Sequence, residues 1–152
     1  MKVALDAMGG DRAPGVNLAG AADALARFRS IEKIYLVGDE AVLQAEAAAH
    51  GLDLSDTRVA LVHAPEVIGM AEPGAKTIRR KKQSSVSVAM DLVKGGEADA
   101  FVSAGNTGAL MAMAKFVLKT LPGIDRPAIA SFFPTLRGES VMLDLGANVQ
   151  CD

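Results

Sequence analysis

The sequence contains little of what metal sites and covalent active sites are usually built from. It has one cysteine, Cys151, and two histidines, His50 and His63, among its 152 residues. A disulfide within one chain is therefore excluded, and the usual spacings of zinc ligands cannot be assembled. The single cysteine also fits a reducing, cytoplasmic compartment. We expect neither a metal ion nor a cofactor.

The sequence also has no strong excess of charge of one sign and no long apolar run. The formal net charge is −2, which gives no general attraction to nucleic acid. No apolar run approaches the roughly 18 residues that span a bilayer. At the amino terminus a carboxylate, Asp6, comes too early for a signal peptide. We expect a soluble chain that can still touch a membrane surface.

What the chain does contain is typical of an α/β protein. Half of it is apolar, only 4% is aromatic, and it has 15 glycines beside abundant alanine. Small residues let helices pack closely on a sheet. The length is enough for one domain with a hydrophobic core and short for two. We therefore expect a single α/β domain over residues 1–152.

Apolar runs of strand length alternate with helical patterns along the chain. Strands are expected at 2–6, 34–38, 59–63, 98–102, 128–133 and 141–145, and helices at about 14–29, 39–50, 84–94 and 109–121. This alternation predicts a doubly wound, mostly parallel sheet with helices on both faces. The last two strands have no helix between them, which favours a local antiparallel hairpin or an antiparallel edge of the sheet. Because no helix follows the final strand, we expect the chain to be the amino-terminal part of a longer protein.

Three loops rich in small or polar residues follow predicted strands. They are Asp6 to Asp11, Ser103 to Gly108 and Asp144 to Asn148. If their strands are parallel neighbours, the loops converge on one edge of the sheet, where ligands of open α/β sheets bind. Uncovered amides and helix starts there would suit an anion. The alternative is that these glycines and aspartates only make tight turns and caps.

The three loops lack the residues of several familiar mechanisms. They hold no histidine, no cysteine and no serine in a nucleophile-elbow setting, so they favour electrostatic positioning of an anion over covalent catalysis. The first predicted strand is not followed by Gly-x-Gly-x-x-Gly, and no Walker loop is present. Sites for dinucleotides and nucleoside triphosphates are therefore not expected.

Four consecutive bases, Arg79 to Lys82, stand just before Gln83-Ser84-Ser85 and a helical pattern. Ser84 or Ser85 is expected to cap that helix. Some of the bases could flank the helix start and create a second anion-favouring site. The alternative is an ordinary solvated charge run.

Four blocks of sequence lie in order at residues 3–14, 80–85, 98–111 and 143–148, and together they span almost the whole chain. In register, these blocks resemble the PlsX-type phosphate acyltransferases of bacterial phospholipid synthesis. Gln83 and Gln150 stand where the family more often has an acidic residue. The resemblance implies transfer of a fatty acyl group from acyl-carrier protein to inorganic phosphate, giving an acyl phosphate. It also implies a homodimer, loose association with the inner face of the membrane, and a fold related to phosphotransacetylases and isocitrate/isopropylmalate dehydrogenases.

Within this family reading, the predicted loops acquire roles. Asn106 and Asn148 would orient the reactants, and Asp6 is a third candidate catalytic residue. Phosphate or the oxyanion would be held by Gly9, Gly10, Ser103, Gly105, Thr107, Gly108, Lys81, Lys82, Ser84 and Ser85. The bases from Arg79 to Lys82 could instead meet the acidic carrier protein. Transfer from an acyl-CoA, as in phosphotransacetylases, and a non-catalytic acyl- or partner-binding fragment remain alternatives, and the chain alone could be inactive.

Overall fold

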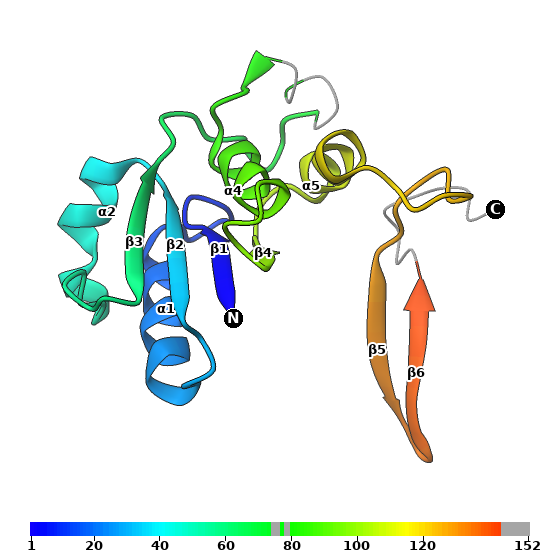
Figure 1. Ribbon diagram of the computed structural model, residues 1–152, viewed down its shortest axis with the longest axis horizontal. Helices are drawn as coiled ribbons and strands as arrows, with labels where there is room; N and C mark the ends of the chain where they lie inside the picture. The colour runs from blue at the N-terminus through cyan, green and yellow to red at the C-terminus, as the bar shows by residue number, and fades with distance from the viewer. Residues whose placement is uncertain (74–76, 78–79, 144–152) are drawn as a thin grey trace.

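The computed structural model describes residues 1–73, 77 and 80–143. Four parallel strands form the central sheet in the order β3-β2-β1-β4 (Figure 1). They are β1 (Lys2–Asp6), β2 (Lys33–Gly38), β3 (Val59–His63) and β4 (Ala100–Val102). All four lie where the apolar runs predict strands. The order reverses at β1, so the carboxyl ends of β1 and β4 flank the switch point where such sheets bind ligands.

Helices cover both faces of this sheet, as predicted. They are α1 (Gly15–Arg27), α2 (Glu40–Glu46) with the 3-10 turn η1 (Ala48–His50), α4 (Ser85–Lys94), and α5 (Thr107–Met113) with the π-helical turn η2 (Ala114–Leu118). Successive side chains of β2 point to opposite faces. Leu36 packs with α1 and α2, whereas Val37 packs with α4, and both are fully buried. This two-sided burial explains why the strands are continuous apolar runs.

Local capping chemistry sets several helix ends. The Asp39 side chain accepts hydrogen bonds from the backbone N–H groups of Ala41 and Val42, at 3.0 and 3.2 Å. At the other end Gly51 has φ +72°, the left-handed conformation that glycine tolerates best. Ser84 caps α4, which confirms one of the two predicted caps.

The carboxyl-terminal third differs in detail from the predicted elements. Helical structure begins at Thr107 and ends with η2 at Leu118, short of the predicted end at 121. The next residue, Lys119, has φ +66° and turns the backbone out of the helix. The predicted hairpin is confirmed as β5 (Ala130–Thr135) paired antiparallel with β6 (Gly138–Leu143). It forms a sheet of its own and stands apart from the four-stranded sheet in Figure 1.

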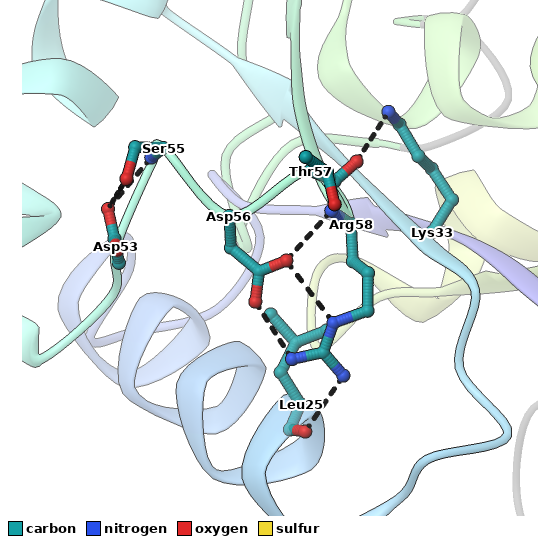
Figure 2. A network of polar contacts seen from close by, with 7 residues as sticks. All are labelled: Leu25, Lys33, Asp53, Ser55, Asp56, Thr57 and Arg58. Carbon is teal, nitrogen blue, oxygen red and sulfur yellow. Dashed lines mark hydrogen bonds and ion pairs between the residues drawn. The ribbon is translucent and has the colours of Figure 1, made fainter.

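A polar network closes the opposite edge of the sheet, at the amino end of β3 (Figure 2). The Arg58 guanidinium makes a two-point contact with the Asp56 carboxylate, with Nη2–Oδ2 at 2.8 Å and Nε–Oδ1 at 3.2 Å. These hydrogen bonds lower the pKa of Asp56. Arg58 also donates to the Leu25 carbonyl of α1 at 3.1 Å. The network therefore ties the last turns of α1 to β3.

Among the helices of the described residues, none combines the length and the apolar character that crossing a bilayer requires.

Candidate functional site

Two of the three predicted loops meet at the carboxyl edge of the sheet. We call residues 6–11 and 103–108 together the β1–β4 corner. The Asp6 carboxylate, fully buried, accepts a hydrogen bond from Ser103 Oγ at 2.7 Å, and that hydroxyl accepts one from the Gly105 N–H at 3.0 Å. The other Asp6 oxygen accepts from the Met8 N–H at 3.2 Å. Asp6 and Ser103 thus join the two loops. Their side-chain oxygens already make hydrogen bonds within the protein.

Glycine is required where the two loops touch. A Cβ atom on Gly9 would overlap the Asp6 carboxylate and come within 3.0 Å of the Gly105 nitrogen. Gly10 has φ +106°, and a Cβ there would lie 3.2 Å from the Ala104 carbonyl oxygen. A side chain at either position would push the loops apart. The two glycines therefore allow the backbone-to-backbone contact that defines the corner.

Asn17 on α1 holds the first loop in place, and the sequence patterns did not single it out. Its Nδ2 group lies 2.9 Å from the carbonyl oxygens of both Ala7 and Gly9, and 3.4 Å from that of Asp6. The only available signal was a polar residue early in a helix that is otherwise mostly apolar, which is common and unspecific. Asn17 acts on the corner through the backbone of the loop.

The second loop contributes several exposed residues to the corner, and Asp11 is exposed at the end of the first loop. Ala104, Thr107 and Gly108 are exposed, and the last two are the first residues of helix α5. Unpaired N–H groups concentrate at helix starts, and the adjoining helix dipole favours negative charge there. Thr107 and Gly108 are therefore accessible to a ligand at this edge of the sheet, whereas Asp6 is fully buried and Ser103 is half-buried.

Asn106 lies inside the corner but is almost wholly engaged with the protein. It is 7% exposed, and its Oδ1 accepts a hydrogen bond from the Ala109 N–H at 2.9 Å as the cap of α5. Its Nδ2 group donates to three carbonyl oxygens of the preceding loop, those of Gly69, Met70 and Glu72, at 3.0, 3.1 and 2.8 Å. The side chain therefore binds the loop from 69 to 72 to the start of α5.

Lys81 lies against that same loop. Its Nζ atom is 2.6 Å from Glu72 Oε1 and 2.7 Å from the Val67 carbonyl oxygen. The Lys81 hydrogen bond, with help from the Gly69 N–H, lowers the pKa of Glu72. Lys82 and Arg80 are exposed, whereas Arg79 lies outside the described residues. Within the basic run, Lys81 therefore binds the loop that ends at Glu72, whereas Arg80 and Lys82 are exposed cations.

Ser84 and Ser85 are buried at the start of α4. Ser84 Oγ accepts from the Ser87 N–H at 3.3 Å, and the Ser85 N–H donates to the Glu66 carbonyl at 3.0 Å. The Ser85 hydroxyl is buried and has no hydrogen-bond partner among the described residues. The backbone N–H groups of both serines therefore donate hydrogen bonds within the protein, and neither side chain faces solvent.

The remaining predicted site residues lie outside the described part of the chain. Asp144 and Asn148 belong to the third loop, which follows β6. The two-stranded sheet of β5 and β6 is separate from the parallel sheet. Within residues 1–73, 77 and 80–143, no group of three or more His, Cys, Asp or Glu side chains could hold a metal ion.

Comparison with known proteins gives a consistent family. Residues 1–152 match the model of a family described as fatty acid synthesis protein. A phosphate acyltransferase of Geobacter sulfurreducens is 55% identical over 151 residues, which cover 99% of this chain and 42% of the relative. A phosphate acyltransferase of Methylococcus capsulatus is 54% identical over 149 residues, which cover 98% and 43%. The chain spans less than half the length of these relatives.

A solved structure supports the fold. The EutD phosphotransacetylase from Staphylococcus aureus superposes with a TM-score of 0.64 at 24% identity, over 100% of this chain and 48% of the other. This likeness confirms the predicted phosphotransacetylase-related architecture and concerns the fold alone. The family match extends over every residue. The chain therefore belongs to the fatty acid synthesis protein family.

Proposed function

We propose that this chain supplies part of the active site of a phosphate acyltransferase. In this reaction a fatty acyl group moves from the thioester of an acyl-carrier protein to inorganic phosphate. The observation that carries the proposal is the β1–β4 corner, where two glycine loops touch at the switch point of the sheet and a helix begins. Relatives named phosphate acyltransferase, at 55% and 54% identity, support it.

The chemistry needs positioning more than it needs a strong base. A phosphate oxygen forms a bond to the thioester carbonyl carbon, which becomes a tetrahedral oxyanion. The carbon–sulfur bond then breaks, the sulfur leaves as a thiolate that takes up a proton, and an acyl phosphate remains. Phosphate is already nucleophilic at neutral pH, and thiols with a pKa of about 8.5 are good leaving groups. Preorganised hydrogen-bond donors aimed at phosphate and at the oxyanion are therefore the main requirement.

Within this proposal the corner residues divide into two groups. Backbone amides at Ala104, Thr107 and Gly108, with the Thr107 hydroxyl, donate hydrogen bonds to phosphate or to the oxyanion. Asp6 and Ser103 hold the two loops together and act on the substrate only through them. The Asn106 amide does the same for the loop from 69 to 72, because its polar atoms already bind protein groups. These three are positioning residues.

A matched pair of threonine variants tests the role of the corner. Residues 1–152 would replace the matching segment of the Geobacter sulfurreducens relative, and acyl phosphate would be trapped as a hydroxamate. Thr107→Val removes one donor and should slow acyl phosphate formation about tenfold or more. Thr57→Val, an exposed threonine at the other edge of the sheet, should leave the rate unchanged. Equal rates for the two variants would contradict the assignment.

The acyl donor and the assembly are further parts of the proposal. We propose that the donor is an acyl-carrier protein and that exposed Arg80 and Lys82 meet its acidic surface. The chimera should then use acyl-carrier-protein thioesters at far lower concentration than acyl-CoA, whereas the reverse order would favour phosphotransacetylase-type transfer. A homodimer in the cytoplasm with loose attachment to the inner face of the membrane completes the proposal. Light scattering and vesicle flotation measure these two properties.

A further inference from the structure

An apolar groove runs along one flank of α1, between that helix and the β4 edge of the sheet. It encloses about 420 Å³ and is lined from α1 by Val16, Gly20 and Ala24 and from the sheet by Val3, Leu5 and Val102. We call these six residues the α1 groove. Within the described part of the chain, no charged side chain lines it, and Asn17 is the one polar lining residue. The groove is distinct from the β1–β4 corner.

The α1 flank of this groove has the form of a helix-packing surface. Val16, Gly20 and Ala24 follow one another at four-residue intervals and therefore line one side of the helix. A Cβ atom on Gly20 would meet no heavy atom within 4 Å, so the space above it is open. Small residues flanked by larger ones let a second helix approach to the usual interaxial distance of roughly 8–10 Å. Val16 is 50% exposed at one end of the row.

The face of the sheet that lines the groove also lacks a covering helix. Parallel sheets are normally covered by helices on both faces, because their strands are apolar on both sides. Here α1 and α2 cover the part of this face that β1, β2 and β3 form. Val102 of β4 is 51% exposed on the same side, and within the described residues β4 is an edge strand that pairs only with β1. The uncovered part of this sheet face therefore lies beside α1.

We propose that the α1 groove seats an amphipathic helix from the part of a phosphate acyltransferase chain that these 152 residues do not span. The relatives provide the chain for it: this sequence covers 42% of the Geobacter sulfurreducens protein and 48% of the phosphotransacetylase of related fold. A helix with an apolar stripe fits the groove because it would bury Val3, Leu5 and Val102 while satisfying its own backbone. It would lie parallel or antiparallel to α1 against the Gly20–Ala24 row.

Co-expression of the two parts tests this proposal. The 152-residue chain would be produced with the unmatched remainder of the Geobacter sulfurreducens relative, and the complex would be isolated through a tag on the remainder. We expect a one-to-one complex. Gly20→Glu and Ala24→Glu place a charge in the groove and should each weaken the complex at least about tenfold. Ala26→Glu, at an exposed position of α1 outside the groove, should leave it unchanged.

Of the two groove variants, Gly20→Glu separates binding from folding, because Gly20 is exposed whereas Ala24 packs against the core beneath α1. Gly20→Glu removes a glycine from a helix at an exposed position and should fold at least as well as the parent chain, which circular dichroism would verify. Failure of the two parts to associate, or a complex that tolerates both groove variants, would overturn the proposal. So would a dimer of the chain alone that Gly20→Glu dissociates, because a second copy would then be the occupant. Binding of a fluorescent fatty acid that the same variant abolishes would assign the groove to an acyl chain instead.

Discussion

At the scale of single residues, Asn106 shows how one side chain can serve two elements. Its oxygen caps α5 while its nitrogen donates to the carbonyl oxygens of Gly69, Met70 and Glu72. Loss of the cap alone costs about 1 kcal/mol, and buried carbonyl groups left without donors cost about 1–3 kcal/mol more. Asn106 is therefore expected to stabilise the fold of the corner as well as its geometry.

Two substitutions separate these contributions. Asn106→Ala removes both and should lower the free energy of unfolding by about 2 kcal/mol or more. Asn106→Asp keeps the cap, because aspartate caps helices as well as asparagine does, but it turns a carboxylate oxygen toward three carbonyl oxygens. Urea denaturation should show a loss as large as that of the alanine variant. A stable Asn106→Asp protein would mean that only the cap matters.

The Glu72–Lys81 ion pair should make the stability of the fold depend on pH in a definite direction. The Lys81 hydrogen bond lowers the pKa of folded Glu72 below its ordinary value of 4.5. The ionised pair therefore stabilises the fold fully above that value, and the stabilisation is lost as the pH falls through the lower, folded-state pKa. Glu72→Gln should reduce the urea midpoint near neutral pH, and this deficit should shrink steadily as the pH falls below 4.5. The exposed Glu139→Gln on β6 serves as the control, and a deficit for Glu72→Gln that does not shrink at low pH would refute the interpretation.

At the scale of elements, the backbone is strained at Lys119, directly after the helical segment formed by α5 and η2. Lys119 follows η2 with φ +66° and ψ 179°, a region that is almost confined to glycine. The sequence offered no glycine there, so the pattern of apolar residues alone extended the predicted helix to 121. The helix ends earlier because the backbone changes direction at Lys119.

This strain predicts a stabilising substitution. Lys119→Gly should raise the free energy of unfolding by about 1 kcal/mol, since glycine adopts that conformation without a Cβ clash. Lys115→Gly, inside η2 and also exposed, should lower it by about 1 kcal/mol. Thermal unfolding of the two variants would show shifts of opposite sign. A destabilised Lys119→Gly protein would show that Lys119 is held by interactions that compensate for its backbone.

At the scale of the whole molecule, the order of the strands brings together loops that are far apart in the sequence. Asp6 and Ser103 meet because β1 and β4 are parallel neighbours, and parallel strands present their carboxyl ends at one edge. The strands themselves could be predicted because each is a short apolar run. The alternation of strands and helices predicts parallel pairing, but it does not say which strands are neighbours. The meeting of two of the three loops therefore followed from the sequence only on the condition that their strands lie side by side, which β1 and β4 do.

The attachment of the loop from 69 to 72 could not be predicted from the sequence. Asn106 reads as a polar residue at a helix start, and nothing local reveals that its amide reaches carbonyl groups more than thirty positions earlier. Lys81 likewise belongs to a run of four bases, among which only packing selects the one that binds Glu72. Burial of Ser84 and Ser85 depends on the same packing. Long-range polar contacts of this kind leave no periodic pattern in the sequence from which they could be predicted.

We propose that the β1–β4 corner, rather than the basic run or the start of α4, binds an oxyanion. The most direct test is a titration of the isotope-labelled chain with inorganic phosphate at constant ionic strength, followed through its backbone amide resonances. We expect saturable shifts at Gly9, Gly10, Ala104, Thr107 and Gly108, with Ser84 and Ser85 unmoved. Shifts confined to Arg80 and Lys82, or no saturable shift at any corner amide, would contradict the account.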